Sequence, residues 1–449
     1  MIDGLRRYRE TKLTGQNWLT AIPAHWEFHR AKRTFCEVDE RSVRGDEELL
    51  SVSHITGVTP RNQKNVTMFM AESYEGHKLC RPADLVVNTM WAWMAAVGVS
   101  RQVGIVSPSY GVYRPRVPSS FMPRFLDYLL RTEAYRAEYV RASRGITTSR
   151  LRLYPEDFLG IPFVQPPIEE QRLIARFLDA HGALTARLIR AKQRLIKLLE
   201  EQKQAIIHRA LTRGLDPNAR LKPSGIPWLG DIPESWEVKR LKAICRFVYG
   251  DSLPSQVRAR GNVNVFGSNG NVGTHTLANT RGPCIIIGRK GSFGKINWSD
   301  QAVFAIDTTY FIDEMVSVSN LRWLYHMLVW LRLDDLSKDS AIPGLAREDA
   351  YNRLVVTPND VAEQTPIANV IDAESRELTE AIDCIQQEIR LVLEFRSRLV
   401  ADVVTGQLDV RQAASALPEI TEFEPIDEPT GGEGFEEAFD DVEKEEVAA

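Results

Sequence analysis

The sequence lacks any apolar stretch long enough to span a bilayer, and its first residues lack the apolar segment of a signal peptide. It has only five cysteines, which are scattered and never spaced as C-x-x-C. We therefore expect neither a disulfide framework nor a cysteine-based zinc site, and we expect the chain in the reducing cytoplasm. With 449 residues, 43% of them hydrophobic, the chain is long enough for two or three globular domains.

Sequence motifs for catalysis are missing as well. No adenine-methylation motif of the Asn/Asp-Pro-Pro-Tyr/Phe type occurs, because the segment Gln165–Ile168 lacks both the polar first residue and the aromatic last one. A phosphate-binding loop would need glycine in place of Arg289 and serine or threonine in place of Ile296. His25 and His29 lie four residues apart without a convincing third ligand, so they are interpreted as structural. The sequence therefore predicts no catalytic residue and no metal site.

The net charge of −4 hides an uneven distribution. Thirteen acidic residues and one basic residue fall between Glu419 and Glu446, which leaves residues 1–418 with a net charge of +8. A mildly basic body fits a polyanionic partner, although this value alone is weak evidence. The acidic tail has few large apolar residues and is predicted to be disordered, most simply as a solubilising extension.

The most informative feature is an internal repeat. Residues 12–32 align without gaps to residues 222–242, with ten identities in 21 positions. Residues 170–216 align in the same way to residues 363–409, with 14 identities in 47 positions. The repeated pairs include Trp18/Trp228, Trp26/Trp236, Glu170/Glu363, Gln171/Gln364, Asp179/Asp372 and Thr212/Thr405. Repeated ends around dissimilar middles indicate one frame that carries two different inserts.

The longer repeat is helical by its pattern. In the second copy apolar residues recur every seven positions, with others four residues after them: Ile371, Leu378, Ile382, Ile385, Ile389, Val392, Leu399 and Val403. The first copy has a broader stripe: Phe177, Leu184, Leu188, Leu195, Leu198 and Ile206. A helix of about 44 residues is roughly 65 Å long and needs a partner. We expect the two copies to pair as an intramolecular coiled coil, rather than to pack separately on unrelated cores.

Between the repeats lie two mixed segments of about 125 residues, each with strands first and a helix after them. The predicted fold class is therefore mixed α+β: two α/β domains separated by two long antiparallel coiled-coil helices, with an internal pseudo-twofold repeat. The predicted boundaries are 1–165 and 213–358 for the domains, 166–212 and 359–408 for the long helices, and 409–449 for the acidic disordered tail.

In the first domain, polar and aromatic residues follow a strand-like run at Asn88–Trp93 and occur again at Ser107–Tyr110. Such residues either line a groove or fill a core, and Trp91 and Trp93 would share a face if the segment is extended. Short polar segments also precede the long helices, at 143–148 and 340–345. The DNA-binding candidates in this domain are Asn88, Trp91, Arg101, Tyr110, Arg144 and Thr147.

The second domain carries two glycine-rich runs, Gly267–Gly273 and Gly288–Lys295. Glycine permits close approach of the backbone to a ligand, and the interleaved Asn, Ser, Arg and Lys can donate to phosphates and base edges. A pair of tight β-turns explains the same runs equally well. The DNA-binding candidates in this domain are Ser268, Asn269, Arg289, Lys290, Ser292 and Lys295.

Together these motifs resemble those of the specificity subunits of type I restriction-modification systems. The resemblance covers residues 1 to about 410. It rests on the duplicated W-L-x-x-I-P-x-x-W-E entry, the Glu-Gln openings of the helices, the segment 104–110 and the run from Tyr249 to Tyr310. It implies two target-recognition domains that each read one half of a bipartite double-stranded DNA site. It also implies that the two helices fix the spacing of the half-sites and bind two modification subunits. The acidic extension departs from the family pattern.

The same resemblance implies that S-adenosylmethionine, ATP and Mg²⁺ are bound by the modification and restriction subunits, and that this chain binds no cofactor and is not an enzyme. An antiparallel helix pair would turn the direct repeat into a pseudo-twofold, as opposed half-sites require. One alternative is part of a stand-alone restriction-modification enzyme, which the missing catalytic motifs disfavour. Another is a coiled-coil scaffold without sequence specificity, which the basic body and the Gly/Asn/Arg loops disfavour.

Overall fold

The computed structural model describes residues 5–63, 73–146, 150–227, 229–336 and 344–418. The chain forms two compact units: unit 1 comprises residues 1–193 and 387–449, and unit 2 comprises residues 194–386. Two long helices, α5 (Ile168–Arg213) and α8 (Gln364–Val404), each contribute one part to each unit. No helix in the described ranges is both long and apolar enough to cross a membrane.

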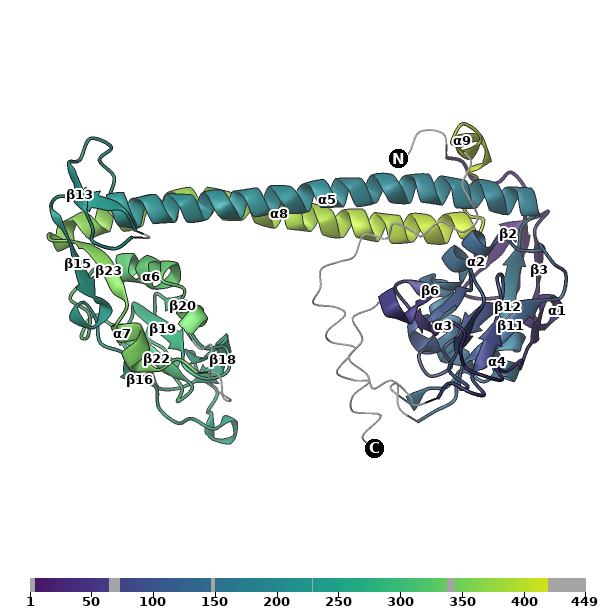
Figure 1. Cartoon of the computed structure of the whole chain (residues 1–449), viewed down its shortest axis with the longest axis horizontal. Helices are drawn as coiled ribbons and strands as arrows, with labels where there is room; N and C mark the ends of the chain where they lie inside the picture. The colour runs from purple at the N-terminus through teal and green to yellow at the C-terminus, as the bar shows by residue number, and fades with distance from the viewer. Residues whose placement is uncertain (1–4, 64–72, 147–149, 228, 337–343, 419–449) are drawn as a thin grey trace. The chain divides into compact units, whose positions relative to one another are not determined.

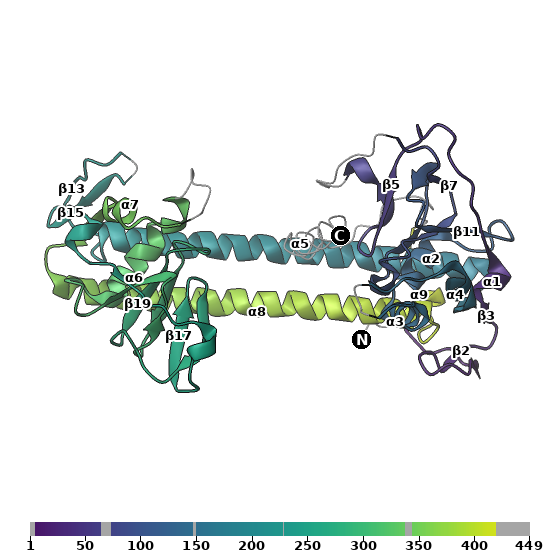
Figure 2. The same cartoon turned by 90° about the horizontal axis from the view of Figure 1, so that it is seen from below.

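The two long helices lie side by side and run antiparallel (Figures 1 and 2). In unit 1, the His181 ring lies 6.0 Å from the Phe395 ring, and Lys192 donates to Glu388. In unit 2, Lys203 donates to Thr379 Oγ1 at 2.8 Å. Residue numbers thus rise along α5 while those of their partners fall along α8, which confirms the predicted antiparallel pairing.

The apolar seam predicted for α8 faces inward, since all eight of its residues are buried or half-buried. The stripe predicted for α5 is largely wrong. Its four leucines are exposed: Leu184 67%, Leu188 45%, Leu195 45% and Leu198 60%. Small and branched side chains on the other side of α5 are buried instead, among them Thr185, Ala186 and Ile189. The helix therefore has two apolar faces, and periodicity alone selected the one with the larger side chains.

Unit 1 contains an antiparallel four-stranded sheet in the order β4-β11-β8-β9. Every residue of β8 and β9 is buried, because helices and loops cover both faces of the sheet. The elements before α5 are β1 Thr11–Leu13, β2 Ala21–Pro23, β3 Glu27–Arg30, α1 Ala31–Thr34, β4 Phe35–Glu37, β5 Leu50–Ser53, β6 Gly57–Pro60, η1 Arg61–Gln63, β7 Lys78–Cys80, β8 Leu85–Val87, η2 Ala92–Met94, β9 Val97–Val99, β10 Gly104–Val106, β11 Gly111–Pro115, α2 Pro123–Leu130, α3 Glu133–Ala142, α4 Pro155–Gly160 and β12 Pro162–Gln165.

Unit 2 repeats this plan with the sheet β16-β22-β19-β20, also antiparallel throughout. Its elements are β13 Leu221–Pro223, β14 Asp231–Pro233, β15 Trp236–Arg240, η4 Leu241–Ala243, β16 Val248–Tyr249, η5 Ser255–Val257, β17 Val263–Gly267, β18 Gly270–His275, β19 Cys284–Gly288, β20 Ile296–Ser299, β21 Phe304–Ala305, β22 Thr309–Asp313, α6 Leu321–Trp330, η6 Leu333–Leu336, α7 Arg347–Tyr351, β23 Leu354–Pro358 and η7 Val361–Glu363. The units differ in their additions, which are the hairpin β5-β6 and the two-stranded sheet β10-β7 in unit 1 and the sheet β18-β17-β21 in unit 2.

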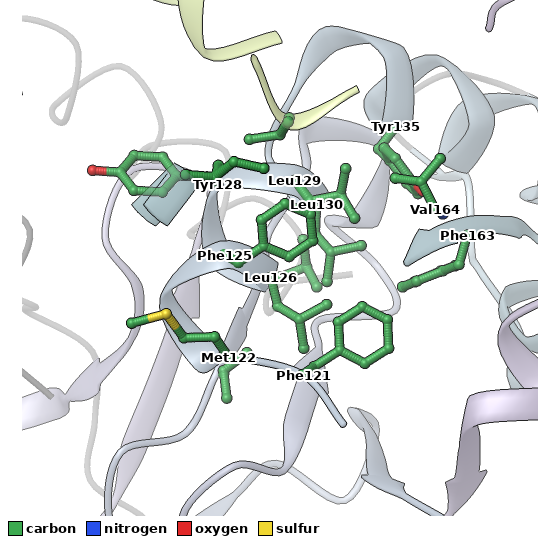
Figure 3. Close-up of a cluster of buried hydrophobic side chains, with 14 of the residues drawn as sticks. Phe121, Met122, Phe125, Leu126, Tyr128, Leu129, Leu130, Tyr135, Phe163 and Val164 are labelled. Atoms are coloured by element: carbon green, nitrogen blue, oxygen red, sulfur yellow. The ribbon is translucent and has the colours of Figure 1, made fainter. Parts of the chain in front are cut away.

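Helix α2 forms the centre of the core of unit 1 (Figure 3). It begins at Pro123, where the missing amide hydrogen costs nothing, and all eight of its residues are buried. Phe35 packs against Phe121 and Phe163 with ring centroids 5.6 and 5.5 Å apart. Burial of each such side chain stabilises the fold by about 1.5–3 kcal/mol. Helix α6 occupies the same place in unit 2 and is capped by the Asn320 side chain, which accepts from the Trp323 amide at 2.9 Å.

The first ten residues of the segment predicted to be an acidic disordered tail lie in the described part of the chain. Residues 409–418 are folded, and they include a short helix, α9 (Arg411–Ser415). Asp409 pairs with Arg6 in a backbone bridge, and Val410 and Ala414 are fully buried in the core of unit 1. The first apolar residues after α8 therefore belong to the fold, whereas Glu419–Glu446 lies outside the described residues.

Candidate nucleic-acid interface

Residues repeated in the sequence attach each sheet to the long helices. In unit 1, Gln171 Oε1 accepts from the Met122 amide at 2.9 Å, just before α2. In unit 2, Gln364 Oε1 accepts from the Asn320 amide at 2.8 Å, just before α6. The repeated glutamines therefore make the same contact with the start of the same helix in both units.

The repeated aspartates provide a second attachment. Asp179 accepts from Arg124 Nε at 2.8 Å and from the Tyr128 hydroxyl at 2.6 Å. Asp372 accepts two hydrogen bonds of 2.7 Å from the Arg322 guanidinium and lies 3.0 Å from His326 Nε2. Arginine that forms several bonds to one carboxylate fixes geometry as well as charge, so each domain is held firmly on its helix.

The repeated entry motif lies where one long helix begins and the other ends. In unit 2, the Trp236 indole donates to Glu363 Oε1 at 3.0 Å and lies against Gly214. In unit 1, Trp26 is fully buried against Gly406, and Tyr8 and His25 bind the Glu170 carboxylate at 2.6 and 2.7 Å. His25 is thus a structural residue, as predicted, and Trp228 lies outside the described residues.

Three segments of unit 1 meet beside the end of β8, and we call them the loop cluster of unit 1: residues 88–94, 107–110 and 152–154. Asn88 Nδ2 donates to the Tyr110 hydroxyl oxygen at 3.0 Å, and Thr89 Oγ1 donates to the Ser109 carbonyl at 2.8 Å. The Leu153 amide donates to the Thr89 carbonyl at 2.9 Å. Two segments that the sequence separates by about 20 residues are therefore joined directly.

Unit 2 contains an equivalent cluster beside the end of β19, the loop cluster of unit 2: residues 288–295, 306–308 and 344–347. The Arg289 amide donates to the Thr308 carbonyl at 2.9 Å, and the Leu345 amide donates to the Arg289 carbonyl at 2.9 Å. The main-chain bond between Leu345 and Arg289 corresponds to the bond between Leu153 and Thr89 in unit 1. The two units therefore present variable loops at the same position of the same frame.

The structure brings some of the predicted DNA-binding residues of unit 1 together and separates others. Asn88, Trp91 and Tyr110 lie in the loop cluster, where Trp91 stacks on Trp93 at 6.1 Å. Residues 92–94 form a 3₁₀ turn rather than an extended strand. Trp91 and Trp93 therefore do not lie on one face of a strand, which was the arrangement expected for an extended segment. Arg101 lies apart from the cluster.

Both predicted arginines of unit 1 have carboxylate partners. Arg101 lies 3.8 Å from the buried Asp127, and burial lowers the pKa of Arg101 and raises the pKa of Asp127. Arg144 forms a bond of 2.8 Å with Asp157, and hydrogen bonding to that carboxylate raises the pKa of Arg144. Thr147 lies outside the described residues.

The predicted residues of unit 2 lie close together. The buried Ser268 hydroxyl contacts the carbonyl oxygens of Lys290 and Thr308 at 2.5 and 3.0 Å, and so holds two loops together. Lys295 Nζ donates to Asn269 Oδ1 at 2.7 Å. Lys290 and Ser292 are exposed, and Arg289 is half-buried with Nη1 donating to the Asp307 carbonyl at 3.0 Å.

Comparison with known proteins finds relatives of one kind. No protein-family model matches the chain. A protein of Methanocaldococcus jannaschii, provisionally named the MjaX type I restriction enzyme specificity subunit, is 31% identical over 137 residues, 30% of this chain and 30% of the relative. The MjaVIII type I restriction enzyme specificity subunit of the same organism is 33% identical over 87 residues, 19% of each chain. The matches span less than a third of these relatives' length.

A chain in a solved structure of the type I R-M system aligns with a TM-score of 0.66 at 17% identity, over 85% of this chain and 98% of that chain. At this identity the likeness shows the fold. The resemblance to type I specificity subunits is confirmed. The duplicated sheet and the paired helices are thus similar to the fold of a chain of a type I R-M system.

The structure adds three residues that were not among the predicted site residues. Tyr249, Tyr310 and Arg347 line a pocket of about 410 Å³ together with Arg289 and Lys290. Burial, together with the neighbouring Tyr249, raises the pKa of Tyr310 to about 12. The two tyrosines begin and end the run that carries the specificity-subunit resemblance, whereas no sequence signal marks Arg347, which the fold brings in from beyond the sheet.

Proposed function

We propose that this chain is the non-catalytic, sequence-specific DNA-binding subunit of a type I restriction-modification complex. The domain of each unit reads one half of a bipartite site through its loop cluster, and the helix pair sets the distance between the half-sites. The observation that carries the proposal is the equivalence of the two loop clusters, which have unlike residues on the same frame. Such an arrangement suits two different half-sites.

The exposed leucines of α5 favour the binding of a partner protein. Leu184, Leu188, Leu195 and Leu198 follow a spacing of four, seven and three residues, which is the repeat of a coiled-coil seam. In unit 1, Leu391 and Phe395 of α8 are also about half exposed. Exposed apolar side chains at this spacing along a helix indicate a protein interface. We propose that modification subunits place helices on this face, and that restriction subunits join the same assembly in the cytoplasm.

In this proposal the chemistry belongs to the partner subunits. S-adenosylmethionine, ATP and Mg²⁺ are expected on the modification and restriction subunits, and the chain itself supplies recognition and spacing.

Methylome sequencing tests the function. The chain and a type I modification subunit are produced together in a host without endogenous DNA methylation. We expect methylation at one asymmetric bipartite motif, and none when the modification subunit is produced without this chain. Methyl transfer or DNA cleavage by the purified chain alone would contradict the proposal and favour a stand-alone enzyme.

A further inference from the structure

The pocket in the loop cluster of unit 2 is built around one aromatic ring. The Tyr249 ring lies 4.9 Å from the Arg289 guanidinium carbon and 5.3 Å from that of Arg347. These cation–π contacts hold two positive groups near each other without a carboxylate. The ring belongs to β16, Arg289 follows β19 and Arg347 begins α7, so three elements converge here (Figure 1).

The lining of the pocket carries an excess of positive charge. It includes Arg289, Lys290 and Arg347, against the single carboxylate of Glu348. Within the described part of the chain, none of the three cations forms an ion pair. Arg347 Nε is buried and has no hydrogen-bond partner among the described residues. A buried donor without a partner is costly, so the site is complementary to a ligand that accepts hydrogen bonds.

The chemistry of the pocket favours an anion over a stacked base. Guanidinium groups already cover Tyr249, and Tyr310 is only 2% exposed. Neither ring is therefore free to stack on a nucleobase. The remaining guanidinium N–H groups and the exposed Lys290 ammonium are donors only, and they suit the unesterified oxygens of a phosphodiester.

We propose that this pocket holds one phosphate of the DNA backbone and thereby fixes the register of the unit 2 domain on its half-site. This inference rests on the proposed function. By contrast, the two arginines of unit 1 predicted to bind DNA are already paired, Arg101 with Asp127 and Arg144 with Asp157.

The salt dependence of DNA binding tests the proposal. The complex of the full chain with its modification subunits is titrated onto duplex DNA that carries the recognised motif, and onto a scrambled duplex, over a series of KCl concentrations. Loss of one phosphate contact reduces the slope of log K against log salt by about 0.9. We expect this reduction for Arg347→Gln, with affinity for both duplexes lowered by the same factor.

Two further variants separate charge from structure. Arg347→Lys keeps the charge and is expected to keep the wild-type slope. Arg220→Gln removes an exposed arginine of unit 2 outside the pocket and is expected to leave both slope and affinity unchanged. Thermal melting of each variant establishes that it is folded.

Two results would overturn the proposal. One is an unchanged slope for folded Arg347→Gln, which would mean that no phosphate contact was lost. The other is weaker binding of the motif-bearing duplex alone, which would make the pocket a reader of bases. If instead the wild-type complex prefers no sequence, the proposed function itself fails, whatever the variants show.

Discussion

Asp179 and Asp372 show how a repeated residue serves two different domains. Each accepts from an arginine at the second position of a core helix, Arg124 in α2 and Arg322 in α6. The next contact differs, since Tyr128 occupies in α2 the place that His326 occupies in α6. Arg124 is only 6% exposed, so its charge depends on the partner carboxylate.

We predict that Asp179→Asn destabilises the protein by about 3 to 5 kcal/mol, because it removes the carboxylate charge that accepts from the buried Arg124 guanidinium and from the Tyr128 hydroxyl. Chemical denaturation of the variant and the wild type measures the difference. The matched control is Glu169→Gln, which removes an exposed carboxylate that pairs with Arg172 at 2.9 Å on the same helix. It is expected to change stability by at most about 1 kcal/mol. Equal losses in the two variants would contradict a structural role for Asp179.

His326 is expected to make unit 2 sensitive to acid. Burial, with the nearby Arg322 and Lys203 cations, outweighs the Asp372 carboxylate and lowers the pKa of His326 to about 4. Between about pH 6.5 and pH 4, the unfolded chain binds a proton at this residue that the folded chain does not. The contribution of His326 to the free energy of unfolding is therefore fully present above about pH 6.5. Below that pH it falls by up to about 1.4 kcal/mol per pH unit.

The variant His326→Gln removes the titrating group and is expected to flatten the stability profile between pH 6.5 and pH 4. Denaturation at pH 8, where the histidine is neutral in both states, gives the baseline cost of the substitution. A variant that keeps the wild-type acid dependence would assign the effect to other groups.

At the residue scale, the sequence predicts which loops lie together better than it predicts which side chains are free to contact a ligand. Asn88 and Tyr110 meet in the loop cluster of unit 1. Arg289 and Lys290 meet in the loop cluster of unit 2, and Ser268 contacts its Lys290 carbonyl. Charge alone cannot separate a DNA contact from a structural ion pair, because the carboxylates that bind Arg101 and Arg144 lie 26 and 13 residues further along the chain. No local pattern shows such a partner.

At the element scale, the two long helices end on glycines with left-handed backbone conformations, as helix C-termini commonly do. Gly214 has φ +70° and Gly406 has φ +77°. A Cβ at Gly406 would lie 2.3 Å from Pro23 Cδ and 3.0 Å from Trp26 Cζ3. The entry motif is therefore packed directly against the end of α8.

We predict that Gly406→Ala destabilises unit 1 by about 2 to 5 kcal/mol, because backbone strain adds to overpacking. The control Gly15→Ala has a similar φ of +73° but no neighbour within 4 Å, and it is expected to cost only about 1 to 2 kcal/mol. Thermal or chemical unfolding of the two variants measures the difference. Similar losses would mean that the packing against Trp26 contributes little.

The elements themselves follow well from the sequence. The seven-residue period predicts α8 and its buried seam, because the repeated apolar residues lie along one face of the helix. The first copy has apolar residues on two faces, so the period alone could not decide which face meets α8. The sequence composition does not predict that segment 409–418 is folded, because the acidic residues after it dominate the composition of the tail.

At the scale of the whole molecule, the exposed leucines of α5 point to an assembly. We predict that Leu184→Glu together with Leu188→Glu abolishes binding of the modification subunits while the chain remains folded, because charges would then lie in an apolar interface. Co-purification and circular dichroism provide the two measurements. The matched control is Leu277→Glu, a substitution at a 68% exposed leucine in unit 2. Retained binding in the double variant would place the docking surface elsewhere.

The main-chain bonds that close the loop clusters have a further consequence for variation. The Leu153 amide and the Leu345 amide each donate to a carbonyl, and neither bond depends on the side chain at Thr89 or Arg289. Substitutions in these loops can therefore accumulate without loss of the frame beneath them. Under the proposed function, the side chains that each loop cluster presents to DNA can then change one at a time while these main-chain bonds persist.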